Sequence, residues 1–319
     1  MLKKCCFLII ILGLISCDKR SETEAKIEEV KADFEVVRFD QKFANSDEAG
    51  LADLKKEYPF LFPARYPDSV WVQKLNDTIQ QEIETEVQKV FPEFSVQNDD
   101  LHSLFQHVKF YFPEFKVPDV FTVTSEVDYK NQVIYTGDYL FVSLDTYLGE
   151  EHKFYMGIQE YLKKNFKSEQ IAVDAAAEIA KKYVPKAESR TFLSHMLYYG
   201  KILYLKDLFI PFKSDAQKMG YREKEMEWAN ANEAQIWRYF IENELLYDTD
   251  SELYSRFLYP APFSKFYLQL DAESPSRLGQ YIGWNIIRSY MEKNDVSILK
   301  MLNTPAEEIF NKANYKPKK

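Results

Sequence analysis

The sequence predicts an α+β fold: a mainly helical single domain, spanning about 33–319, built around a small β-sheet. Apolar residues recur at every third or fourth position over most of the chain, which is typical of amphipathic helices. One stretch, 119–149, is instead rich in Val, Thr, Tyr and Phe and indicates two or three strands in a meander, with turns at 130–131 and 137–138. Hydrophobic residues make up 46% of the 319 positions, which is enough for a sizeable core. A small sheet with many helices is an α+β arrangement.

The first residues have the pattern of a bacterial lipoprotein signal. Two lysines at positions 3 and 4 precede an apolar run, 5–15, which is too short to span a bilayer but fits the core of a signal peptide. The run ends in L-I-S-C, with a leucine three positions before Cys17 and a small residue directly before it. This resembles the lipobox, which implies that a signal peptide, 1–16, is removed and that Cys17 is acylated. An ordinary signal peptide with an incidental cysteine is the alternative.

The charged residues that follow predict a tether. Cys17 is the last cysteine of the chain, so the mature protein has no partner for an internal disulfide. Several acyl chains on one cysteine give stable membrane anchoring. We predict that 17–32 comprises the lipidated Cys17 and a solvated, locally helical tether. A net charge of −9 without clustered Lys and Arg excludes a nucleic-acid partner.

Within the domain, each element is predicted from local spacing. Alternating apolar residues at 33–40 predict a first strand. The prolines of 58–71 predict an extended connector, and Ser69 is predicted to cap a helix that ends near residue 91. Another helix is predicted at 101–115, before the strands.

The chain after residue 149 is predicted to be mainly helical. A capping box with Pro at the first helical position is predicted at 304–307. The apolar spacing predicts helices at about 151–165, 168–184, 189–208, 214–246 in one or two pieces, 277–293 and 305–312.

The helix predicted at 189–208 carries His195, four positions before Tyr199. In zinc peptidases with H-E-x-x-H, two imidazoles one turn apart bind zinc, and the glutamate deprotonates the bound water. The five positions here read H-M-L-Y-Y. Met196 cannot act as a base, and Tyr199 is a poor second ligand. A packed core histidine is therefore favoured over a metal ligand at His195.

Two other segments could bind something. The sequence N-E at Glu233 begins an apolar helix and resembles the motif that supplies a glutamate ligand in one branch of zincins; an exposed glutamate on an amphipathic helix is the alternative. In 273–294, Gly279 and Gly283 share one helix face, although each costs about 1 kcal/mol of helix propensity. Close approach of a neighbouring element would explain both glycines. A groove for a partner chain is the alternative, with a possible interaction helix at Arg277, Gly279, Gly283 and Trp284.

Several segments together carry a resemblance to one family. They are the lipobox, Y-P-F-L-F-P and P-D-S-V-W in 58–71, N-E-A-Q-I-W-R-Y-F-I-E-N-E-L-L-Y (232–247), P-A-P-F-S-K-F-Y (260–267) and S-P-S-R-L-G-Q-Y-I-G-W-N-I-I-R-S-Y-M (274–291). In this order and spacing they resemble the gliding-motility lipoprotein GldB family, and the similarity covers essentially the whole chain. That family is similar to predicted zinc-dependent proteases of the zincin type, with H-E-x-x-H where 195–199 stands here.

The resemblance implies a cell-envelope lipoprotein, anchored in the inner or outer membrane and facing the periplasm. It also implies a requirement for gliding and type 9 protein secretion, together with other proteins of those machineries. His195 matches the first zincin ligand and Glu233 the third, whereas Met196 and Tyr199 depart from the motif. We therefore expect a degenerate zincin-like domain at 33–319, without catalysis, cofactor or metal, in which His195 and Glu233 are vestigial.

Two other hypotheses belong to different classes. The first is a membrane-tethered zinc metallopeptidase that uses His195, Glu233 and a further ligand. The second is a surface lipoprotein that binds glycan or peptide through its many tyrosines and phenylalanines, although most of these fall at core-facing positions.

Overall fold

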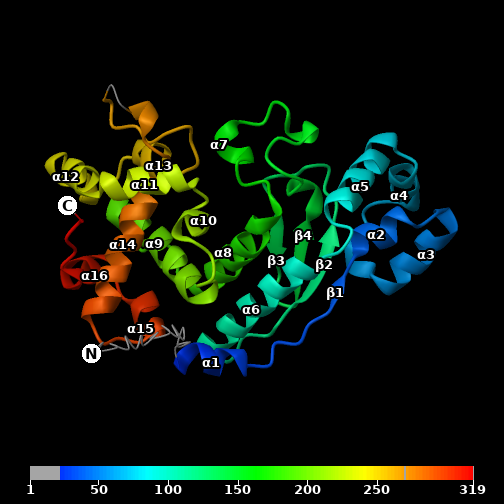
Figure 1. Cartoon of the computed structure of the whole chain (residues 1–319), viewed down its shortest axis with the longest axis horizontal. Coiled ribbons are helices and arrows are strands. Elements are labelled where there is room, and N and C mark those ends of the chain that lie inside the picture. Colours follow the sequence, from blue (N-terminus) through cyan, green and yellow to red (C-terminus); the bar gives the residue numbers. More distant parts are fainter. Residues whose placement is uncertain (1–21, 269–270, 319) are drawn as a thin grey trace, which may run out of the picture.

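A small mixed β-sheet lies near the middle of a mainly helical molecule (Figure 1). The computed structural model describes residues 22–268 and 271–318. The predicted signal peptide, 1–16, and the predicted lipidation site, Cys17, lie outside the described residues. The described part has an α+β arrangement, so the predicted fold class is confirmed. No described helix combines the length and apolar character needed to cross a membrane.

The four described strands have the order β1-β2-β4-β3. Strand β2 is parallel to both of its neighbours, and β3 pairs antiparallel with β4 in a hairpin whose turn holds Gly137 at φ 106°. The predicted meander is wrong, because β2 and β3 follow each other in the chain but are not neighbours in the sheet. The strands are β1 (Val36–Val37), β2 (Asp119–Val123), β3 (Val133–Tyr135) and β4 (Tyr139–Ser143).

The strand predicted at 33–40 is much shorter than expected. Only β1 joins the sheet, and helix α2 (Phe39–Ala44) begins two residues later. Phe39 and Phe43, one helical turn apart, are both buried in the smaller of two apolar cores. Helical spacing of apolar residues therefore replaces alternation from Phe39 onward.

The segment before the sheet packs on the domain. Helix α1 (Glu22–Glu28) lies against helix α6 (Ser95–Tyr111). Ile27, on the buried face of α1, is 1% exposed. The described part of the predicted tether, 17–32, is thus docked on α6, which corrects the expectation that this segment is solvated.

Two helices replace the single helix predicted to start at Ser69. The first helix ends at Leu75, and a new helix begins after Asp77. Asp77 caps this new helix, because its Oδ1 accepts a hydrogen bond from the N–H of Ile79 at 2.7 Å. Ser69 lies inside the preceding helix, which follows Pro67, so the predicted N-cap is wrong. The next predicted helix, 101–115, corresponds to α6. The helices between α2 and α6 are α3 (Glu48–Glu57), α4 (Asp68–Leu75) and α5 (Thr78–Val90).

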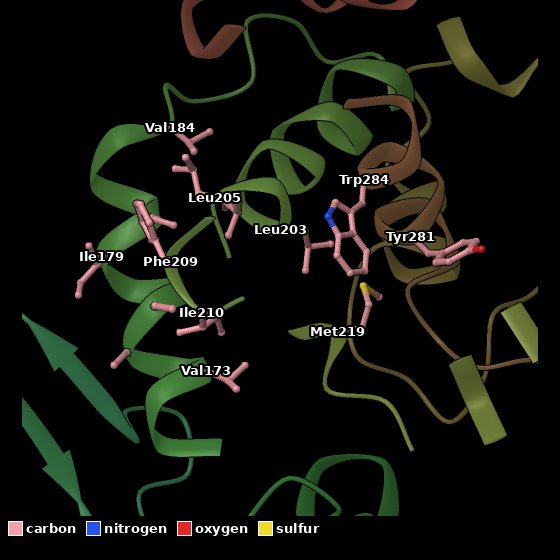
Figure 2. Packing of buried hydrophobic residues seen from close by; sticks show 14 of the residues in the cluster. Val173, Ile179, Val184, Leu203, Leu205, Phe209, Ile210, Met219, Tyr281 and Trp284 are labelled. Atoms are coloured by element: carbon pink, nitrogen blue, oxygen red, sulfur yellow. The ribbon is translucent and has the colours of Figure 1, made fainter. Parts of the chain in front are cut away.

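Three long helices form the centre of the larger core. The middle one, α9, packs against both α8 and α14. Figure 2 shows Phe209 of α9 beside Ile179 of α8, and Trp284 of α14 beside Leu203 of α9. The sequence predicted all three helices to within a few residues, at α8 (Ile171–Tyr183), α9 (Phe192–Phe209) and α14 (Leu278–Lys293).

Two other predicted helices differ from the structure. Within 151–165 only α7 (Glu160–Lys163) is α-helical. The range 214–246 holds three short helices, because Gly220 at φ 63° ends the first and Asn232 separates the other two. The remaining helices are α10 (Asp215–Met219), α11 (Glu223–Ala231), α12 (Glu233–Glu242), α13 (Glu252–Phe257), α15 (Ile298–Asn303) and α16 (Ala306–Ala313).

The predicted capping box at 304–307 is not formed. Thr304 Oγ1 donates to the carbonyl oxygen of Lys300 at 2.7 Å. The free N–H at the start of α16, on Ala306, donates instead to Glu188 Oε1 at 2.6 Å. A carboxylate distant in the sequence therefore caps this helix.

Candidate functional site

Helices α9 and α14 cross backbone to backbone. A Cβ added to Gly283 of α14 would lie 2.1 Å from the carbonyl oxygen of Met196, and one added to Gly200 of α9 would lie 2.4 Å from the carbonyl oxygen of Gly283. No side chain fits between the two helices at this point. The close approach predicted from the glycines is confirmed at Gly283. The sequence reasoning missed Gly200, although a glycine inside an apolar helix is itself a signal.

The predicted interaction helix is part of the core. Trp284 is 0% exposed, and its Nε1 donates to Asp207 Oδ2 at 2.8 Å. A Cβ on Gly279 would lie 2.9 Å from the carbonyl oxygen of Phe257. An interaction surface at Arg277, Gly279, Gly283 and Trp284 is therefore a wrong prediction, because the glycines and the indole pack inside the molecule.

Arg277 stands at the start of α14 in a left-handed conformation, with φ 62°. Its Nη2 donates to the carbonyl oxygen of Gly220 at 3.1 Å, and its guanidinium lies 5.4 Å from the centroid of the Tyr221 ring. These contacts connect the start of α14 to the end of α10. They explain why this arginine holds a backbone conformation that side chains rarely adopt.

His195 packs against an aromatic ring. Its imidazole is half-buried on α9, with its ring centroid 4.4 Å from that of Tyr254 and the two rings tilted by 40°. The Tyr254 hydroxyl donates to the carbonyl oxygen of Arg190 at 2.9 Å, which holds the tyrosine ring in place. Burial lowers the pKa of His195, so the ring is neutral at neutral pH. Tyr199, one turn further on, has its pKa raised to about 12, mainly by burial. It therefore keeps its proton at neutral pH.

Met196 is placed differently from its neighbour. Its side chain is fully buried, and its backbone forms the α9 side of the contact with Gly283. The position that carries the general base in H-E-x-x-H is therefore occupied here by part of the helix crossing.

Glu233 is a buried carboxylate at the start of α12, only 2% exposed. Its Oε1 accepts from the Tyr315 hydroxyl at 2.7 Å and from the N–H of Lys318 at 3.2 Å. The Tyr281 hydroxyl lies 3.0 Å from Oε2. Burial, followed by the nearby carboxylate, raises the pKa of both tyrosines. The alternative of an exposed glutamate is wrong: Glu233 joins α12, α14 and the C-terminal segment.

His195 and Glu233 have different partners in the structure: Tyr254 lies against His195, whereas Tyr281, Tyr315 and Lys318 surround Glu233. Across residues 22–268 and 271–318, no three His, Cys, Asp or Glu side chains are grouped so that they could hold a metal ion.

An ion cluster that the sequence did not reveal joins α9, α10 and α14. Arg288 donates to both carboxylate oxygens of Asp207 at 2.7 Å and to both of Asp215 at 2.8 and 2.9 Å. Its guanidinium also lies 3.7 Å from the centroid of the Trp284 ring. Burial opposes ionisation of Asp215, but the hydrogen bonds from Arg288 outweigh it and lower the pKa of this carboxyl. These contacts explain the position of Trp284.

A second missed group lies under α8 and α9. The Tyr147 hydroxyl donates to Asp174 Oδ2 at 2.8 Å. Lys206 donates to the carbonyl oxygen of Lys218 at 2.8 Å, and burial lowers its pKa to about 8. Burial raises the pKa of Asp174, which lines a small pocket of 170 Å³ together with Glu178. These polar side chains connect Tyr147 to α8 and α9 to α10.

One family model matches the chain over residues 20–317, with the description "Gliding motility protein GldB". The match covers almost the whole described structure and both helices of the crossing. No match was found among curated proteins or among solved structures. The zincin-like architecture expected from the resemblance therefore stays a prediction.

Proposed function

The chain belongs to the family of the gliding motility protein GldB, and on that premise we propose that it is a non-catalytic component of the gliding and type 9 secretion machinery. In this proposal the protein is a cell-envelope lipoprotein, held in a membrane by acylated Cys17 and facing the periplasm. Its helical domain acts as a structural or interaction component, alongside other proteins of the two machineries.

The geometry around His195 is the observation that carries the non-catalytic role. A catalytic zinc site needs three converging protein ligands and an open position for water. The His195 ring packs against Tyr254 at an interplanar angle of 40°, and Met196 is buried in the helix crossing. Glu233 is a buried carboxylate that already accepts hydrogen bonds from the Tyr315 hydroxyl and from the backbone N–H of Lys318. A metal ion at this carboxylate would compete with both hydrogen bonds.

Genetic complementation tests the role in the cell. We expect deletion of the encoding gene to abolish gliding and type 9 secretion, and we expect the His195→Ala chain to restore both. His102→Ala is the matched control, because it removes an exposed imidazole from α6. A deletion strain that still glides and secretes would refute the proposed function.

Elemental analysis separates the proposal from a metallopeptidase. The purified chain is expected to contain far less than one zinc per molecule, with or without His195. Zinc bound at one equivalent in the wild type, retained in His102→Ala and lost in His195→Ala, would contradict the non-catalytic role.

Acyl labelling tests the anchor. The wild-type chain is expected to incorporate a palmitate analogue and to sediment with membranes, and Cys17→Ala is expected to do neither. A Cys17→Ala chain that stays membrane-bound would show that another segment holds the protein.

A further inference from the structure

The docked N-terminal segment fixes how far the domain can stand from a membrane. Beyond the burial of Ile27, Gln106 Nε2 donates to the carbonyl oxygens of Glu28 and Val30, both at 3.0 Å. Lys109 Nζ donates to the carbonyl oxygen of Lys31 at 2.8 Å. Residues 22–34, here called the strap, therefore run along α6 and are held by its side chains.

The end of the strap is held as well. The Phe34 ring packs edge-on against Phe105 of α6 at 4.9 Å between centroids. The next residue, Glu35, donates its N–H to Asp119 Oδ1 at 3.0 Å and accepts a hydrogen bond from the N–H of Val120 at 2.8 Å. The strap thus leads directly into β1, and the residue between them is hydrogen-bonded to the start of β2.

Docking shortens the chain that is free to act as a spacer. An extended chain spans at most about 3.6 Å per residue. A spacer from Cys17 to residue 33 could hold the domain about 55 Å from its anchor, whereas the spacer from Cys17 to Glu22 reaches only about 18 Å. A domain of this size has a radius of gyration of about 19 Å, which corresponds to a diameter of about 50 Å. The maximum length of the short spacer is therefore much smaller than the diameter of the domain.

The strap lies at one edge of the molecule. In Figure 1, which looks down the shortest axis, α1 lies at the lower edge and α7 at the upper edge. Elements that lie apart within a view are also apart in space, so α1 and α7 are at opposite edges of the domain. Strand β2 gives the direction from the strap into the molecule. It starts beside Glu35, at the end of the strap, and its carboxyl end points away from that contact.

We infer that the edge formed by α1 and the C-terminal part of α6 faces the lipid surface, and that the strap holds this edge against the membrane. The α7 edge then faces away from the membrane. This inference rests on the acylation of Cys17 that is part of the proposed function. The partner of the α1 edge is the lipid headgroup layer itself.

The experiment measures energy transfer from two positions to labelled lipids. The only cysteine of the mature chain is Cys17, and it is acylated in this proposal, so a cysteine introduced elsewhere is the only free thiol. A donor dye is attached at Lys26→Cys in α1 or at Glu160→Cys in α7, both exposed. The full lipidated chain is inserted into phosphatidylethanolamine/phosphatidylglycerol vesicles that carry an acceptor headgroup. We expect transfer from position 26 to be at least about twofold higher, because the two edges differ in height by a large part of the domain diameter.

A spacer variant provides the matched control. Sixteen Gly and Ser residues inserted between residues 21 and 22 leave every strap contact in place but restore a long spacer. This insertion is expected to lower transfer from position 26 and to reduce the difference between the two positions. Ile27→Asp, which should release the strap, is expected to act in the same direction.

Each result has a distinct meaning. Vesicle binding with equal transfer from the two positions, or with higher transfer from position 160, would overturn the orientation and leave the anchor standing. A mature chain that does not bind vesicles would overturn the anchor and, with it, the orientation. Transfer from position 26 that is unchanged by the inserted spacer would overturn the role of the short spacer.

Discussion

Gly283→Ala is expected to disrupt the crossing of α9 and α14. The new Cβ would lie 2.1 Å from the carbonyl oxygen and 2.6 Å from the carbonyl carbon of Met196, whereas carbon and oxygen atoms normally stay about 3.3 Å apart. Both atoms belong to a helix backbone, so neither can rotate away. The two helices must separate locally by about 1 Å, and a gap of this size removes a quarter to a half of each dispersion contact along the interface.

The magnitude follows from two opposing effects. Overpacking a well-packed core costs about 1–3 kcal/mol and occasionally more. A clash between two backbones belongs at the upper end, because no side-chain rotamer relieves it. Replacing a helical glycine by alanine gains about 1 kcal/mol of helix propensity. We expect Gly283→Ala to lower the free energy of unfolding by about 2 kcal/mol.

Urea unfolding of the mature chain, followed by circular dichroism, measures this change. Gly50→Ala is the matched control: Gly50 also lies in a helix, but its added Cβ would meet the Ser46 hydroxyl at 2.8 Å, and that side chain can rotate. The control is expected to change stability by less than about 1 kcal/mol in either direction. If Gly283→Ala unfolds within about 1 kcal/mol of Gly50→Ala, the backbone contact does not limit this position and the reasoning is wrong.

Three further changes test the buried polar groups. Burial lowers the pKa of Lys206 to about 8 from a usual 10.5, so the unfolded chain binds more protons between these values. The free energy of unfolding of the wild type should therefore rise, relative to Lys206→Met, as pH increases from 8 to 10.5, by up to about 1.4 kcal/mol per pH unit in urea titrations; a flat difference would contradict this. Arg288→Lys cannot contact both carboxylates in pairs and should cost about 2 kcal/mol in the same assay. The control Lys224→Arg, at an exposed position of α11, should cost little. Glu233→Gln should speed hydrogen exchange of the amides of Tyr315, Lys316 and Lys318, because Tyr315 and Lys318 lose a charged acceptor. Protection equal to the wild type would show that the C-terminal segment is held by other contacts.

Much of the helical part could be predicted because its information is local. The spacing of apolar residues specified α8, α9 and α14 to within a few residues, since each helix needs a continuous buried face. The glycines of α14 could also be read correctly. A helical glycine lowers helix propensity, and at Gly283 the structure shows that close backbone contact is the reason.

The order of the strands could not be predicted from the same kind of pattern. Alternation and turns identify strands, but they do not state which strands become neighbours. Here β2 pairs with β4 and not with β3, which follows it in the chain. The prediction of a meander failed for that reason.

The polar part of the candidate site was also beyond local reasoning. Arg288 and Asp207 are 81 positions apart, and Glu233 meets Tyr315 across 82 positions. The strap is held through carbonyl oxygens of the backbone, which every residue has. The apolar residues of this charged segment, Ile27, Val30 and Phe34, are too few and too widely spaced to distinguish docking from solvation.

The two faces of α9 explain why the sequence H-M-L-Y-Y is compatible with this fold. Met196 and Gly200, one turn apart, form the face that meets Gly283 of α14. His195 and Tyr199, also one turn apart, belong to a half-buried face, where the imidazole packs at a tilt against Tyr254. A glutamate in place of Met196 would bury a carboxylate beside the crossing, and an unpaired buried charge is strongly destabilising. The packing that holds α9 against α14 therefore favours an apolar residue where a zinc peptidase needs its base. On the other face, the contact of His195 with Tyr254 requires no metal, which agrees with the proposal of a structural or interaction component.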